Sequence, residues 1–220
     1  MSRTLVKLYY DIVSPYGWLG FEILCRHQHE WKIHLDLNPV FLSGLMKSTG
    51  NTPPGMVPAK AKYMNIELKR LSDFHRVPLS LPNNLFEFMF TNNNISALRL
   101  LTLVKISHPD KLEVLSREFF KRILATDEAK MDLHILQTAM ETVGIVGKEA
   151  SRLLEEMGTQ GKEGLKKCTA EALEYGAFGV PYMVAFVGDK PNPYFGTNQI
   201  YLLADLLREK FNDKTTRSKL

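Results

Sequence analysis

The pattern of apolar and polar positions predicts that the chain opens with a strand, a helix and a second strand. Residues 4–12 are rich in β-branched and aromatic side chains, which is typical of a buried strand. Ser14 followed by Pro15 indicates a helix start, since a hydroxyl caps the helix and proline fits its first position. Apolar spacing continues to about His29, and residues 31–40 alternate as in a half-buried strand. A helical crossover makes the two strands parallel.

The middle of the chain has a different character. Residues 43–58 are rich in Gly, Pro, Ser and Thr and predict a long irregular loop, a place where function often lies. From residue 59 to 167 nearly every segment carries apolar residues at three- and four-residue spacing. This stretch is therefore expected to be almost entirely helical.

The last part returns to mixed structure, with a hairpin between two helices. Its expected elements are a helix over 161–175, a turn over 176–181, a strand over 182–187, a Gly/Pro turn over 188–193, a short strand over 194–196 and a final helix over 198–211.

Composition narrows the class of protein. Hydrophobic residues make up 45% and charged residues 24% of the 220 positions, the usual mix of a soluble globular protein, and no run is long enough to predict an integral membrane segment. The net charge of +4 is spread along the chain, so nucleic acid is not an expected partner. Cys25 and Cys168 are far apart and outside any CxxC pair, which favours a reducing compartment. No metal-ligand spacing is visible, and no metal is expected.

The two ends of the chain predict where it is delivered. The N-terminus lacks a basic segment followed by an apolar run, so no secretory signal is expected. Ser218, Lys219 and Leu220 form the tripeptide that the peroxisomal import receptor binds, after a polar stretch suited to an accessible tail. We therefore expect a peroxisomal protein with that receptor as a partner.

The order of elements and four separated motifs carry a family resemblance. Strand–helix–strand followed by strand–strand–helix is the thioredoxin arrangement, and a helical insertion resembles its DsbA-like branch. Ser14 stands where redox members have the first cysteine of CxxC. The strings YDIVSPYGWLGFEILCR (10–26), TGNTPPG (49–55), YGAFGVP (175–181) and FGTN (195–198) resemble those of the kappa-class glutathione transferases. The fold class implied is α/β, a thioredoxin-like domain formed by residues 1–58 and 165–220 and interrupted by an all-helical insertion at 59–164.

The resemblance implies a glutathione transferase. Its co-substrate is glutathione, its second substrate a small hydrophobic electrophile, and organic hydroperoxides are further candidates. Kappa-class proteins occur as homodimers, in peroxisomes and in mitochondria. Two alternatives stay open: a glutathione-dependent cis–trans isomerase resembling 2-hydroxychromene-2-carboxylate isomerase, and a non-catalytic carrier of peptide or acyl ligands, because a fold does not fix a function.

Ser14 is the candidate catalytic residue. Taken alone, Ser-Pro at a helix start is ordinary capping worth about 1 kcal/mol. The same helix end favours an anion, and a hydroxyl there can donate to a thiolate. Serine cannot form a disulfide, so the thiol has to come from the substrate, and glutathione fits. Pro15 fixes the turn, and Tyr16 offers its backbone N–H or its ring.

The resemblance also implies residues that bind the rest of glutathione. Each has an ordinary alternative: a plain turn, a helix cap, a turn asparagine or a solvated lysine. Family members commonly have Ser-Asp at 197–198, so the uncharged amide here implies a weaker contact with the ammonium group. The expected contacts are Val180 before a cis Pro181 for the cysteinyl main chain, Thr197 and Asn198 for the γ-glutamyl group, Asn51 for the tripeptide backbone or glycine end, and Lys60 for the glycine carboxylate.

Four apolar residues are candidates for the second-substrate site, with core packing as the alternative for each. They are Leu45, Met46, Met56 and Met64.

Overall fold

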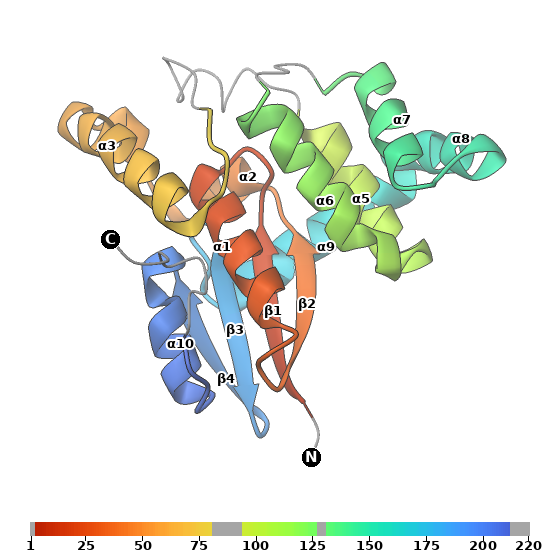
Figure 1. Ribbon diagram of the computed structural model, residues 1–220. Coiled ribbons are helices and arrows are strands. Elements are labelled where there is room, and N and C mark those ends of the chain that lie inside the picture. Colours follow the sequence, from red (N-terminus) through yellow and green to blue (C-terminus); the bar gives the residue numbers. More distant parts are fainter. Residues whose placement is uncertain (1–2, 81–93, 127–130, 212–220) are drawn as a thin grey trace.

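The computed structural model describes residues 3–80, 94–126 and 131–211, and its centre is a four-stranded sheet (Figure 1). The strand order is β2-β1-β3-β4. The predicted tripeptide Ser218-Lys219-Leu220 lies outside the described residues. The first and last parts of the chain thus share one sheet, formed by β1 (Thr4–Tyr10), β2 (Ile33–Pro39), β3 (Tyr182–Val187) and β4 (Lys190–Phe195).

The strand directions agree with the prediction. β1 and β2 are parallel over their whole length, from Thr4 opposite Ile33 to Tyr10 opposite Pro39, and α1 (Pro15–His27) is the crossover between them. β3 runs antiparallel to both β1 and β4. The α/β thioredoxin arrangement with inserted helices is therefore confirmed.

β4 begins earlier than predicted. The turn expected over 188–193 is wrong, because Lys190 already pairs with Val187 and only a tight loop separates the strands. Gly188 in that loop has a φ of 61°, a conformation that glycine adopts without steric cost. Pro191 and Pro193 lie within β4, where they are tolerated because β4 is last in the strand order and needs no N–H on its outer side.

The loop predicted over 43–58 is also wrong in part. It contains α2 (Leu42–Thr49) and a short 3₁₀ turn (Pro54–Met56). The buried side chains of α2 are Leu42, Leu45 and Met46, a three- and four-residue spacing whose burial outweighs the weak helix propensity of the Ser, Gly and Thr between them. The helix ends at Gly50, which has a left-handed φ of 69°.

Helices cover both faces of the sheet (Figure 1). Val6 and Leu8 of β1 belong to a large core cluster together with residues of α1 and α10 (Ile200–Leu206). Tyr9 and Val184 face the opposite side and pack with α2 and α9 (Lys162–Glu174). Alternation along β1 therefore supplies apolar side chains to two separate layers.

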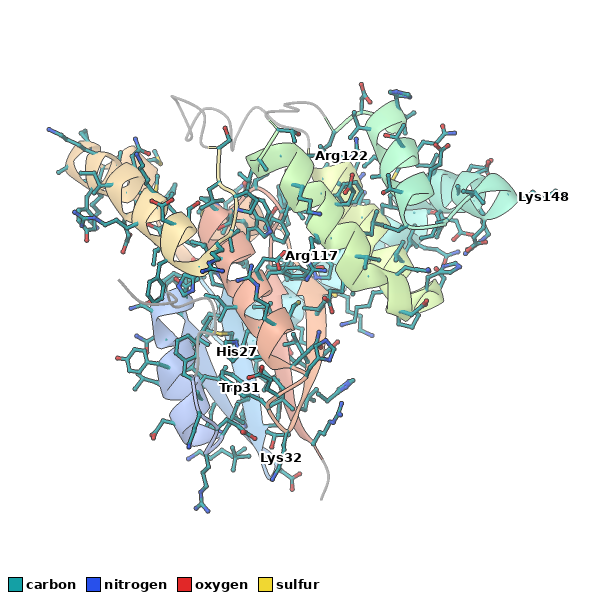
Figure 2. All side chains as sticks on the ribbon, viewed as in Figure 1. His27, Trp31, Lys32, Arg117, Arg122 and Lys148 are labelled. Atoms are coloured by element: carbon teal, nitrogen blue, oxygen red, sulfur yellow. The ribbon has the colours of Figure 1, made fainter. Side chains whose placement is uncertain are left out.

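Residues 59–167 are mostly helical, as predicted, in the part that the structure describes. Trp18 of α1 stacks on Phe120 of α6 with ring centroids 5.8 Å apart. Arg117 of α6, which Figure 2 labels, donates to Glu22 of α1 at 2.8 Å. The boundaries predicted for the insertion stay a prediction. These helices are α3 (Pro58–His75), α5 (Ile95–Ser107), α6 (Pro109–Leu124), α7 (Leu133–Thr142) and α8 (Gly147–Glu156), with a π-helical turn at Met157–Gly161 before α9.

The final helix is shorter than the predicted 198–211. A 3₁₀ turn (Thr197–Gln199) precedes α10, and Arg208, with a left-handed φ of 56°, follows its end. Phe211 then stacks on His27 with ring centroids 5.2 Å apart and also lies near Trp31. His27 and Trp31 are labelled in Figure 2. Aromatic packing therefore holds this segment against the end of α1 without helical structure. Of the helices in the described ranges, none combines the length and apolar character that a membrane crossing needs.

We predict that Gly20→Ala destabilises the protein. A Cβ atom at Gly20 of α1 would lie 2.8 Å from the ring of Pro181, closer than two carbons can approach. We expect a loss of about 1–3 kcal/mol from overpacking, although alanine itself favours a helix by about 1 kcal/mol over glycine. Urea denaturation measures the change.

Gly158→Ala is the control for Gly20→Ala. A Cβ at Gly158 meets no atom within 4 Å, so this variant should be neutral or stabilising. Equal stability of the two variants would contradict the close packing of α1 on Pro181.

Candidate active site

Residues from distant parts of the sequence surround one cavity of about 430 Å³. Its walls come from the start of α1, the segment after Gly50, one side of α3, and the segments on either side of the β3–β4 hairpin. Every residue predicted to bind glutathione, except Lys60, lines this cavity. They are Ser14, Pro15, Tyr16, Asn51, Val180, Pro181, Thr197 and Asn198.

Ser14 caps α1 and also faces the cavity. Its Oγ accepts a hydrogen bond from the Gly17 N–H at 3.0 Å, and only 4% of the residue is exposed. Within the described ranges the hydroxyl proton has no acceptor of its own. The two functions considered from the sequence are therefore compatible, since the cap uses a lone pair of Oγ and leaves its proton for a bound group.

Tyr16 adds an available backbone donor beside Ser14. Pro15 has no N–H, so Tyr16 provides the first backbone N–H of α1, and within the described ranges no acceptor bonds to it. Its hydroxyl donates to Glu67 Oε2 of α3 at 2.5 Å. Burial, and then the Glu67 carboxylate, raise the pKa of Tyr16, so the phenol stays protonated. The N-terminus of α1 thus presents the Tyr16 N–H and the Ser14 O–H to the same cavity.

The segment before β3 exposes main-chain groups. The peptide bond between Val180 and Pro181 is cis, as the resemblance implies. Neither the N–H nor the C=O of Val180 bonds to another described residue. Asn51 Nδ2 donates to the Phe178 carbonyl at 2.8 Å and so joins the loop after α2 to this segment. Val180 can therefore pair with an extended peptide, as a strand edge does.

The fourth wall is the turn at 196–198. Gly196 has a φ of 91°, and a Cβ there would lie 2.7 Å from Asn198 Oδ1, so only glycine allows the amide this position. Thr197 Cγ2 lies against Gly20 of α1. The Asn198 amide oxygen lies close to Gly196 and carries no charge toward the cavity.

Lys60 lies in an adjoining cavity of about 400 Å³. Tyr16, Pro54, Met64 and Glu67 line both cavities, so they form the boundary between them. Lys60 therefore does not share the cavity that contains Ser14, and the Tyr16–Glu67 pair lies at the boundary between the two.

Two of the four apolar candidates for the second-substrate site line the main cavity, and two do not. Met46 and Met64 line the main cavity. Leu45 is fully buried in the core beneath α2, and Met56 is 55% exposed outside the cavity. Core packing was the correct interpretation for Leu45.

Asp11 is buried next to the site and forms hydrogen bonds with the segments that carry site residues. The sequence interpretation did not identify it. Its carboxylate accepts from the N–H groups of Val13 (3.2 Å) and Leu42 (2.8 Å) and from Asn94 Nδ2 (2.8 Å). The Asp11 carbonyl also accepts from the Ser14 N–H at 3.1 Å. Burial raises the pKa of the Asp11 carboxyl to about 6, although these hydrogen bonds act in the opposite direction.

Two further cavity residues were missed, Glu67 and His75, both on α3. With Met64 and Leu71 they follow the three- and four-residue spacing of one helix face. Polar residues on an otherwise apolar face are the signal that could have identified them. For Asp11 the signal was an acid directly between a buried strand and a helix cap.

The two cysteines do not belong to the site. Burial raises the pKa of the Cys25 thiol and that of the Cys168 thiol, so neither is activated as a thiolate. Neither lines the main cavity. Among residues 3–80, 94–126 and 131–211, no group of three His, Cys, Asp or Glu side chains could hold a metal ion.

Comparison with known proteins agrees with this geometry. The family model of the DSBA-like thioredoxin domain matches residues 5–208. Glutathione S-transferase kappa 1 of Homo sapiens is 42% identical over 96% of this chain and 93% of its own length, and that of Rattus norvegicus is 41% identical over 94% and 92%. A solved structure of 2-hydroxychromene-2-carboxylate isomerase superimposes with a TM-score of 0.72 at 20% identity, covering 93% of this chain and 94% of its own.

We predict that the stability difference between wild type and Asp11→Asn depends on pH. The folded-state pKa of about 6 exceeds the ordinary value of about 3.9, so folding takes up a proton between these pH values. The stabilisation of the wild type by this group is complete below about pH 4 and is lost as the pH rises through 6. The difference should fall by roughly 2–3 kcal/mol between pH 4 and pH 7.

Urea unfolding of both proteins across this range measures the difference. Asp73→Asn, which removes an exposed carboxylate on α3, controls for the loss of a surface charge. A stability difference between wild type and Asp11→Asn that does not change with pH would contradict a raised pKa of the buried Asp11 carboxyl.

Proposed function

Because this chain belongs to the kappa class of the glutathione S-transferases, within the DSBA-like thioredoxin family, we propose that its main cavity binds glutathione and ionises the thiol for transfer to an electrophile. One observation carries this proposal. The Ser14 hydroxyl sits at the N-terminus of α1 with its proton available to the cavity, next to main-chain groups of Val180 suited to an extended peptide.

Glutathione would lie across the four walls of the cavity. Its cysteinyl main chain pairs with Val180 ahead of Pro181, which places the sulfur near Ser14. Its γ-glutamyl end lies at the turn that carries Thr197 and Asn198. Its glycine end lies toward Asn51, and its carboxylate reaches Lys60 only across the boundary at Pro54.

Ser14 and the helix end would lower the thiol pKa. The Ser14 O–H and the Tyr16 N–H donate to the sulfur, and the dipole of α1 adds positive potential there. Each unit of pKa lowering requires about 1.36 kcal/mol, and a charge-assisted hydrogen bond supplies about 1.5–3 kcal/mol. Ionisation near neutral pH is thus within reach of these groups, with the thiol proton released to water.

The thiolate would then attack the second substrate. With an aryl halide, a carbon–sulfur bond forms as the carbon–halogen bond breaks and halide leaves. With an organic hydroperoxide, the thiolate takes the terminal oxygen and an alcohol leaves, and a second glutathione completes a disulfide and releases water. Both reactions start from the same ionised sulfur.

The two alternative functions differ from this one in testable ways. Glutathione-dependent isomerisation uses the same thiolate but releases glutathione unchanged. A peptide or acyl carrier would need no thiolate at all. Conjugation is favoured because the relatives at 41–42% identity are transferases by name.

The cellular context forms part of the proposal. We infer delivery to the peroxisome through Ser218, Lys219 and Leu220, with the mitochondrion as the second family location, and a homodimer as the assembly. An apolar electrophile fits the second-substrate region because Met46 and Met64 line the cavity.

We predict that Ser14→Ala and Ser14→Gly both abolish the ultraviolet thiolate absorbance of bound glutathione. Each should also lower kcat/KM with a chlorodinitrobenzene acceptor by about a hundredfold, the size of effect seen when one preorganised donor is removed. Calorimetric titration should show that glutathione still binds, because the other walls remain.

The pair of variants separates capping from catalysis. Glycine caps a helix nearly as well as serine, whereas alanine costs about 1 kcal/mol. If Ser14 acted only as a cap, the glycine variant would keep its thiolate signal and turnover, and the proposal would be wrong.

We predict that Asn198→Asp tightens glutathione binding about fivefold at neutral pH. A carboxylate would meet the γ-glutamyl ammonium in a charge-assisted hydrogen bond, about 1 kcal/mol stronger than one with an amide. Calorimetric titration gives the affinity. Glutathione lacking its α-amino group is the control ligand and should not gain affinity. Equal gains for both ligands would place the γ-glutamyl end elsewhere.

A further inference from the structure

One face of α3 forms the wall of the main cavity that the proposed contacts of the thiol and the γ-glutamyl end leave free. Met64, Glu67, Leu71 and His75 line it at spacings of three, four and four residues. The proposed contacts of the thiol and the γ-glutamyl end lie on α1, the segment before β3 and the turn after β4. The second substrate would therefore approach the sulfur along α3.

This wall is apolar except for a carboxylate and an imidazole. Within the described residues, Glu67 is the one carboxylate among the cavity walls, and no Lys or Arg lines the main cavity. Lys60 lies two turns earlier on α3 and lines only the adjoining cavity. A bound acceptor would thus share the main cavity with the Glu67 carboxylate, whereas Lys60 and Glu67 share only the adjoining cavity.

The hydroxyl of Tyr16 fixes the position of that carboxylate. The 2.5 Å hydrogen bond to Glu67 Oε2 spans from the start of α1 to α3. Tyr16 follows Ser14 by two residues, so the bond holds the carboxylate close to the helix end where the sulfur would lie. Because burial and then Glu67 raise the pKa of Tyr16, the proton of this hydrogen bond stays on the phenol.

We infer that Glu67 is a specificity-determining residue that selects against anionic acceptors and favours neutral or cationic ones. The inference rests on the proposed transferase function and names the acceptor class of the same cavity. A negative charge within several ångströms of a bound acceptor discriminates by sign, because a partly buried site screens charges less than water does.

The test compares three acceptors of one reaction type. They are 1-chloro-2,4-dinitrobenzene, an analogue that carries a carboxylate and an analogue that carries a trimethylammonium group. For each, kcat/KM is measured with wild type, Glu67→Gln and Glu67→Ala. The amide of glutamine keeps an acceptor for the Tyr16 hydroxyl while it removes the charge, and alanine removes both.

In Glu67→Gln, kcat/KM for the carboxylate acceptor divided by that for the neutral acceptor should rise about tenfold over wild type. The same ratio for the trimethylammonium acceptor should fall by a similar factor. Glu67→Ala should move both ratios in the same directions. Asp73→Asn removes an exposed charge from the same helix outside the cavity, and it should change neither ratio by more than about twofold.

Unchanged ratios in both Glu67 variants, or equal shifts in Asp73→Asn, would overturn the inference while the transferase function stands. The thiolate absorbance of wild-type protein with glutathione separates the two failures. Its absence, together with no turnover of the neutral acceptor, would overturn the transferase proposal and this inference with it.

Discussion

The buried carboxylate of Asp11 is the interaction on which the rest of the site depends. It accepts hydrogen bonds from the N–H groups of Val13 and Leu42 and from the side chain of Asn94. The end of β1, the start of α2 and the start of α5 therefore meet at one residue. The carbonyl of Asp11 accepts a hydrogen bond from the N–H of Ser14. Ionising a carboxyl group that is only 1% exposed costs free energy, and the three hydrogen-bond donors offset part of that cost. The position of the α1 cap follows from this arrangement.

The N-terminus of α1 explains how a thioredoxin-like fold can activate the thiol of a bound ligand. A helix N-terminus stabilises a thiolate whether the sulfur belongs to the protein or to a ligand. With Ser14 there, the chain supplies a hydrogen bond but no sulfur, so the thiol has to come from the substrate. The close contact of Gly20 with Pro181 brings the segment that carries Val180 up to that helix end. Binding groups and activating groups thereby converge although about 165 residues separate them in sequence.

Period-two and helical apolar patterns predicted the strands of the sheet and most of the helices, because they identify elements, and turn signals identify their ends. Most of the cavity wall was predicted by the family resemblance. The sequence could not predict α2, whose Leu42, Leu45 and Met46 are stabilised by burial against the sheet and not by local propensity. Nor could it place Glu67 against Tyr16, since that contact depends on how α3 packs beside α1. Lys60 was chosen by resemblance, and the packing of α3 puts it in the adjoining cavity.

A crystal structure of the glutathione complex tests the central claim most directly. The account predicts the sulfur within hydrogen-bond distance of Ser14 Oγ and the Tyr16 N–H, the cysteinyl main chain paired with Val180, and the γ-glutamyl end at Thr197 and Asn198. Glutathione bound with its sulfur away from the N-terminus of α1, or bound outside the cavity, would contradict the account.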